Sequence, residues 1–98
     1  MKIINPTTEA VIKEVAEDKP ASIQIKFETA KAAQKVWAKV PLKERIACIA
    51  KFNELMLANA DMIAADLTSE VGKPLDQAKG EISGGVGRSE YFVENSEK

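Results

Sequence analysis

The stretch from residue 20 to residue 95 carries apolar side chains at helical spacing, and proline and glycine divide it at fixed points. Pro41 ends one helix because proline lacks a backbone N–H, and Gly72 ends another because glycine suits the left-handed residue past a helix end. Apolar residues three and four positions apart mark one face of a helix. The pattern predicts four amphipathic helices: one over 20–39, one from 42, one after Asn59 that stops at Gly72, and one over 75–95.

Each predicted helix has an apolar stripe that we expect to face a core. The stripes consist of Ile23, Phe27, Ala30, Gln34 and Trp37; of Ile46, Ile49, Phe52 and Met56; of Ile63, Leu67 and Val71; and of Leu75, Ala78, Ile82, Gly85 and Phe92. Gly85 is expected to pack closely against a neighbour, since a glycine otherwise costs a helix roughly 1 kcal/mol. Four short helices cannot hide all of this surface among themselves, so we expect self-association.

The N-terminal residues differ from the rest in having two short β-branched runs, "KIIN" and "AVIKEV", separated by the turn-forming "PTTE". They predict a hairpin that lies on other structure, because a two-stranded ribbon is marginal alone in water. The expected fold is therefore mainly α, with a short hairpin followed by about four helices. The chain forms a single segment, 1–98, with the β ribbon in 1–18 and the helices in 20–98.

The charge balance limits the partners of the chain. Lys and Arg number 14 and Asp and Glu number 15 in 98 residues, so the net charge is −1. This balance argues against a nucleic-acid or an anionic membrane surface. The chain lacks the roughly 20 consecutive apolar residues of a membrane span, and its single cysteine cannot form a disulfide within the chain, so we expect a cytoplasmic protein.

Two glycine motifs resemble phosphate-binding loops and fail in detail. In "EVGKPL" the residue after Lys73 is Pro74, where a phosphate loop needs Ser or Thr, and a helix precedes Gly72. The later glycines, from Gly80 to Gly87, lack the spacing and the preceding strand of a dinucleotide fingerprint. We interpret Gly72 as a helix stop, and we assign no catalytic and no coenzyme-binding residue to this chain.

Cys48 is the one candidate nucleophile. It lies on the apolar side of the second predicted helix, and the chain has no histidine to act as its base. No helix N-terminus lies beside it to lower its pKa. We therefore expect a buried, structural thiol.

Three segments, in this order, resemble the start of an NAD(P)-dependent aldehyde dehydrogenase: "INPTTEAVIKEV", "AAQKVWAKVPLKERI" and "EVGKPLDQAKGEI". The family has an Asn-Pro turn before a strand, a helix ending in tryptophan, a Pro-Leu-x-x-Arg step and an acid-x-Gly-Lys-Pro turn. The run "GKPLDQAKGEIS" is most similar to succinate-semialdehyde dehydrogenases. The resemblance covers nearly the whole chain, although "ISGGVGRSEYF" is richer in glycine than the family helix.

The resemblance implies that this chain is an N-terminal fragment of an α/β coenzyme domain, whose partner is the remainder of the dehydrogenase chain. The parent would oxidise an aldehyde, in this subfamily succinate semialdehyde, with NAD or NADP. The family's catalytic cysteine, glutamate and asparagine and its coenzyme contacts lie downstream of residue 98, so we expect the fragment to be inactive and to bind neither coenzyme. Some family members hold a monovalent cation at positions that correspond to Ile4 and Glu70. The alternative is a stand-alone helical module for protein interaction or self-assembly.

Overall fold

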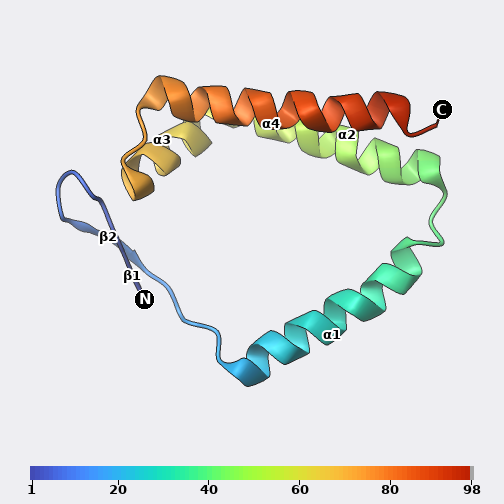
Figure 1. Ribbon diagram of the computed structural model, residues 1–98, viewed down its shortest axis with the longest axis horizontal. Coiled ribbons are helices and arrows are strands. Elements are labelled where there is room, and N and C mark those ends of the chain that lie inside the picture. Colours follow the sequence, from blue (N-terminus) through green and yellow to red (C-terminus); the bar gives the residue numbers. More distant parts are fainter. Residues whose placement is uncertain (98) are drawn as a thin grey trace.

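The computed structural model describes residues 1–97 and contains one hairpin and four helices (Figure 1). The prediction of a mainly α fold that begins with a hairpin is confirmed. The elements are β1 (Lys2–Ile4), β2 (Val11–Glu14), α1 (Pro20–Trp37), α2 (Leu42–Ala58), α3 (Ala60–Val71) and α4 (Leu75–Asn95). Among the described residues, no helix is long and apolar enough to cross a membrane.

The hairpin is antiparallel and closes over the turn that the sequence predicts. Lys2 lies opposite Glu14, and the register shifts between Ile3 and Ile4. The side-chain Oδ1 of Asn5 accepts hydrogen bonds from the backbone N–H groups of Thr7 and Thr8, at 2.8 and 3.2 Å. The asparagine side chain thus holds the turn that follows it.

The start of α1 is fixed by polar contacts and by Pro20 at the first helical position. The Ser22 hydroxyl accepts the backbone N–H of Lys19 at 2.9 Å and donates to the Asp18 carboxylate at 2.8 Å. Lys26 pairs with the same carboxylate at 2.6 Å. The hydrogen bond from Lys26, and then that from Ser22, lower the pKa of Asp18. Asp18 and Pro20 thus mark the start of this helix.

The turn between α3 and α4 depends on glycine. Gly72 has φ +73°, in the left-handed region, and its N–H donates to the Thr68 carbonyl at 2.9 Å. Pro74 then immediately precedes α4. The helix-stop interpretation of Gly72 is confirmed.

The buried core is small and lies where α4 packs on α2 and α3. Ala64, Ala78 and Ile82 form a buried cluster, with Met56 and Leu67 packed against it. The Asp61 carboxylate pairs with the Lys79 ammonium at 2.7 Å and joins α3 to α4. The hydrogen bond and the charge of each partner lower the pKa of Asp61 and raise the pKa of Lys79.

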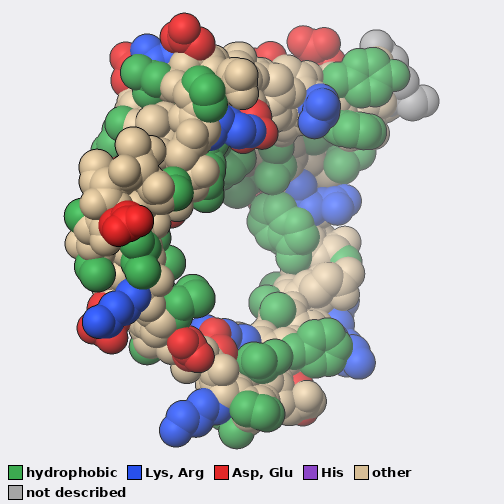
Figure 2. All heavy atoms as spheres, turned by 60° about the vertical axis from the view of Figure 1, so that its left-hand side comes forward, with side chains coloured by type: hydrophobic (Ala, Val, Ile, Leu, Met, Phe, Trp, Pro, Cys, Tyr) green, Lys and Arg blue, Asp and Glu red, His purple; other side chains and the backbone are tan. Residues whose placement is uncertain are grey.

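Helix α1 stands apart from this core. It contains no buried residue, and Figure 1 shows that it forms the far side of an open ring. An opening passes through the molecule in Figure 2, with hydrophobic side chains on its rim. The radius of gyration is 17.4 Å, whereas a compact domain of this length has about 13 Å.

Several residues expected to face a core are therefore exposed. Ala78 and Ile82 are buried as predicted, but Phe27 is 57% exposed and Phe92 67% exposed. A Cβ added at Gly85 would meet no atom within 4 Å, so the predicted close packing of Gly85 is wrong. In each case the neighbouring elements within residues 1–97 lie too far away to cover the side chain or the added Cβ.

We predict that Gly72→Ala destabilises the chain by more than about 1 kcal/mol, because φ is positive and the new Cβ would lie 2.8 Å from Pro6 Cγ. Gly80→Ala is the matched control. Its Cβ would enter open space on a helix, so it should raise the stability by up to about 1 kcal/mol. Urea unfolding followed by circular dichroism measures both changes. Equal effects would contradict the assignment of Gly72 as a helix stop.

We also predict a pH-dependent effect of Asp61→Asn. The folded-state pKa of Asp61 is lowered, so the ion pair with Lys79 stabilises the fold above the unfolded pKa and loses this effect as the pH falls through the folded value. The variant should melt slightly below the wild type at neutral pH, and the two should converge in acid. Asp66→Asn is the control, because Asp66 has no ion pair within residues 1–97. A difference that persists below the folded pKa would refute the electrostatic origin.

Candidate functional site

The hairpin turn contacts the α3–α4 turn at one corner of the ring. The contact is between Pro6 and Gly72, where even a methyl group would not fit. It brings the Asn-Pro turn and the Glu-x-Gly-Lys turn together, although they are more than 60 residues apart in the sequence. Only glycine permits both the left-handed backbone and this close approach.

The two predicted cation ligands lie on the segments that meet at this corner. Ile4 ends β1 and is 48% exposed, and Glu70 lies exposed in the last turn of α3. Hard cations bind six or more oxygens in most protein sites, and these two residues supply few of them. Within residues 1–97, no three His, Cys, Asp or Glu side chains converge on a metal position. The cation site at Ile4 and Glu70 stays a prediction.

Lys73 meets a carboxylate. Its ammonium group pairs with the side chain of Glu81 across the first turns of α4. Both residues line a hollow of about 460 Å³ together with Gly80, Gly84 and Arg88. Since a helix precedes Gly72, this surface lacks the strand–loop–helix arrangement of a phosphate loop.

A second hollow, of about 270 Å³, lies where the end of α1 meets α2 and α4. Its lining is mostly apolar and includes Trp37, Ile46, Ile49 and Phe92. Arg45 Nε donates to the Val40 carbonyl at 3.1 Å and ties the α1–α2 connection to α2. This hollow offers apolar contact and holds no nucleophile with a neighbouring base.

Cys48 lies on α2 and is exposed. The prediction that it is a buried thiol is therefore wrong. Met56 on the same side of α2 packs against the buried cluster, but no part of residues 1–97 covers the Cys48 side chain. Burial cannot be inferred from an apolar stripe when the element that would cover it is missing.

Asn53 is the functional candidate that the sequence pattern missed. It is 3% exposed, and neither its Oδ1 nor its Nδ2 has a hydrogen-bond partner among residues 1–97. A buried amide without partners costs free energy. The available signal was the position of Asn53 on the buried side of α2, four residues before Leu57 and seven after Ile46.

The structure is thus of a mainly helical class, with a hairpin at its start and broad exposed apolar faces on its helices. The chain belongs to the aldehyde dehydrogenase family, whose pattern it matches over residues 1–98. It is 37% identical to a glutarate-semialdehyde dehydrogenase of Pseudomonas putida over 98 residues and 36% identical to a succinate semialdehyde dehydrogenase of Acinetobacter baylyi over 96. A probable succinate-semialdehyde dehydrogenase [NADP(+)] of Sinorhizobium fredii is 30% identical over 96 residues.

These matches cover 98 to 100% of this chain and 20% of each relative. The chain therefore spans about a fifth of the length of the curated relatives. The stand-alone interaction module is not favoured, because the family match extends over all of the residues.

We predict that Cys48 reacts with a thiol reagent in the folded chain nearly as fast as in the unfolded chain, because its side chain is exposed. The chain has no second cysteine, so the signal comes from this residue alone. Iodoacetamide labelling followed by mass spectrometry, with and without denaturant, gives the ratio of the two rates. Strong protection in the folded chain would show that Cys48 is covered.

Proposed function

We propose that this chain is the N-terminal structural segment of an NAD(P)-dependent dehydrogenase that oxidises a short semialdehyde carrying a carboxylate. The observation that carries the proposal is the family match over residues 1–98, together with three relatives named for succinate or glutarate semialdehyde. Residues 1–98 would form one segment of the coenzyme domain, in a cytoplasmic enzyme.

The segment would contribute support and no chemical groups. Cys48, the one thiol, is exposed on α2 without a histidine to act as its base. Nucleophilic catalysis needs such a base or a lowered pKa. We therefore place the thiol, the general base and the coenzyme contacts of the enzyme outside this segment, and we expect the 98-residue chain alone to bind neither NAD nor NADP.

The remainder of the dehydrogenase would cover exposed apolar side chains of the α2–α4 pair. Phe52 on α2 is 55% exposed and Phe92 on α4 is 67% exposed, and Ile49, which borders the same hollow as Phe92, is 41% exposed. Aromatic side chains of this size gain most from burial, at about 25 cal/mol per Å² of apolar surface. The exposed aromatics support a covering element.

The test joins this segment to the rest of the reading frame in its gene. We expect the complete protein to reduce NAD or NADP with succinate or glutarate semialdehyde, followed by coenzyme absorbance, and much more slowly with an aldehyde that lacks the carboxylate. Cys48→Ser should retain nearly all of this activity, because Cys48 takes no part in the chemistry. Loss of activity in a folded Cys48→Ser enzyme would contradict the proposed role.

The 98-residue chain is the matched control for the complete protein. It should show no turnover and no heat of coenzyme binding in calorimetry. Micromolar binding of NAD or NADP by this chain would place a coenzyme site within residues 1–98 and would overturn the structural role.

A further inference from the structure

The seam between α2 and α4 contains a buried amide that residues 1–97 leave without partners. Asn53 is 3% exposed, and neither its Oδ1 nor its Nδ2 has a hydrogen-bond partner among the described residues. It lines two hollows along the seam, one of about 280 Å³ and one of about 230 Å³. Because a buried polar group without partners costs free energy, Asn53 marks a place where a further group is expected to bind.

The larger of these hollows is acidic, and we call it the glutamate groove. It is lined by Asn53, Leu57 and Val93 and by three carboxylates, those of Glu54, Glu90 and Glu94. None of the described residues that line it is basic. Glu54 pairs with Lys51, whereas Glu90 and Glu94 have no ion-pair partner within residues 1–97. The groove therefore has two carboxylates available to a ligand.

These two carboxylates are also unfavourably placed on α4. Glu90 and Glu94 are four residues apart on one side of the helix, so their negative charges repel each other. The C-terminal end of a helix carries a partial negative charge, which repels Glu94, and α4 has no basic residue in its last turn. One cation in the glutamate groove would relieve both repulsions beside the buried amide.

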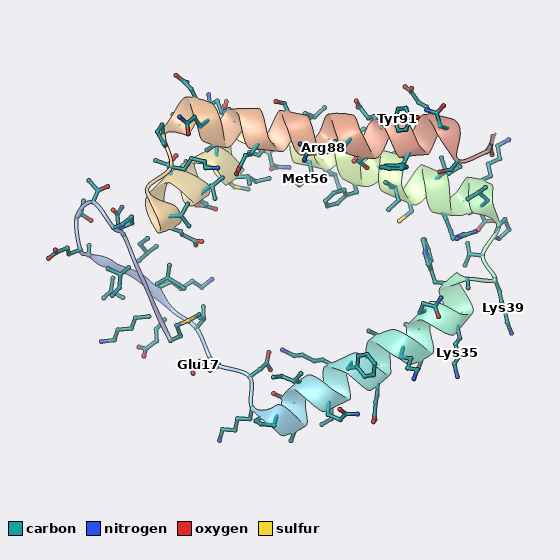
Figure 3. The ribbon with its side chains drawn as sticks, in the orientation of Figure 1. Glu17, Lys35, Lys39, Met56, Arg88 and Tyr91 are labelled. Atoms are coloured by element: carbon teal, nitrogen blue, oxygen red, sulfur yellow. The ribbon has the colours of Figure 1, made fainter. Side chains whose placement is uncertain are left out.

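The described basic residues lie elsewhere. Arg88 is about 200° around α4 from Glu90, and it borders the hollow that Lys73 lines. Figure 3 shows Lys35 and Lys39 on the outer side of the ring at the end of α1. A cation that fills the glutamate groove would therefore come from outside residues 1–97.

The chemistry of the groove favours a guanidinium group over a metal ion or an ammonium group. Within residues 1–97, no three His, Cys, Asp or Glu side chains are placed to hold a metal ion. Arginine carries five N–H donors in one plane, enough for both carboxylates and for Asn53 Oδ1, and it is more weakly hydrated than lysine. No hydrogen bond fixes the Asn53 amide, so a turn about its side-chain bonds can bring it to the groove.

We propose that an arginine side chain from the remainder of the dehydrogenase polypeptide docks in the glutamate groove. Its guanidinium pairs with Glu90 and Glu94 and donates to Asn53 Oδ1, while a backbone carbonyl of the same segment accepts from Asn53 Nδ2. The chain spans 20% of the length of its relatives, so most of such a polypeptide lies outside it. Of the proposed function, this site requires only that residues 1–98 belong to a longer polypeptide.

A double variant, Glu90→Gln with Glu94→Gln, tests the site in the 98-residue chain and in the complete protein encoded by the reading frame. In the 98-residue chain it removes two repulsions, so the melting temperature should rise by about 2 to 5 °C. In the complete protein it removes the ion pairs with the arginine, so the melting temperature should fall. Thermal unfolding followed by circular dichroism gives both signs.

Asn53→Leu should show the same reversal of sign. Leucine has nearly the same volume and no polar atoms, so it should raise the melting temperature of the 98-residue chain. In the complete protein it deprives the guanidinium of an acceptor and should lower the melting temperature. The matched control is Glu14→Gln with Asp66→Asn, which changes the charge equally at carboxylates without an ion pair in residues 1–97 and should have the same sign in both proteins.

A small probe tests the guanidinium directly. Acetyl-arginine amide added to the 98-residue chain should shift the NMR signal of the Asn53 side-chain amide. Acetyl-citrulline amide, which has nearly the same shape and no charge, should bind at least about fivefold more weakly. Glu90→Gln with Glu94→Gln should abolish this preference.

Two results would overturn the proposal. A complete protein that the double glutamine variant stabilises, as it stabilises the 98-residue chain, would contain no cation in the groove. An Asn53 signal that ignores the arginine probe, or that responds equally to citrulline, would exclude a guanidinium site. A complete protein that shows the reversal but does not oxidise a semialdehyde would refute the proposed function and keep the arginine site.

Discussion

The contact of α4 with α2 and α3 holds the described structure together. It is made largely by small side chains, since Ala64 and Ala78 are completely buried and Ile82 is nearly so. Alanine lets two helix backbones approach closely, so a few residues give a dense contact with little apolar volume. The contact fixes the direction of three helices, and the turn at Gly72 then sets where the hairpin can lie.

This small core explains which sequence predictions succeeded. Helix limits depend on local rules, and Pro20, Pro41 and Gly72 determine them regardless of what lies nearby. The Asn5 turn and the helix stop at Gly72 were predictable for the same reason. The family resemblance was also predictable, because the motifs that carry it are local runs of sequence.

Burial was less predictable because it depends on partners. An amphipathic stripe shows which face of a helix prefers contact, and it does not show whether a contact exists. Phe92 and Ile82 lie on the same predicted stripe of α4, yet Ile82 is 6% exposed and Phe92 67%. The difference is that Ile82 packs against Ala64 of α3, whereas Phe92 borders the open hollow at the end of α1. Cys48 and Gly85 were misjudged on the same ground.

At the candidate site, too, local motifs could be predicted, and contacts between distant segments could not. The Pro6–Gly72 contact joins two motifs that the sequence singled out separately, and their meeting could not be derived from spacing. Asn53 was missed because a single polar residue on an apolar face carries no motif. Its importance is visible only when both of its amide atoms are seen to be buried without partners.

The position of α1 follows from the turn that connects it to α2. The N–H groups of Lys39 and Val40 donate to the carbonyls of Val36 and Trp37, and Arg45 holds the Val40 carbonyl. These bonds order the connection itself, while no residue of α1 is buried. A change in the direction of α1 therefore breaks few contacts and exposes almost no apolar surface. A helix held in this way can pack against any surface that offers apolar contact and opposite charge. Most of the free energy gained by burying the apolar side chains of α1 would come from that contact. The open ring is thus the form that a short, ordered turn gives to a helix of which no residue is buried by residues 1–97.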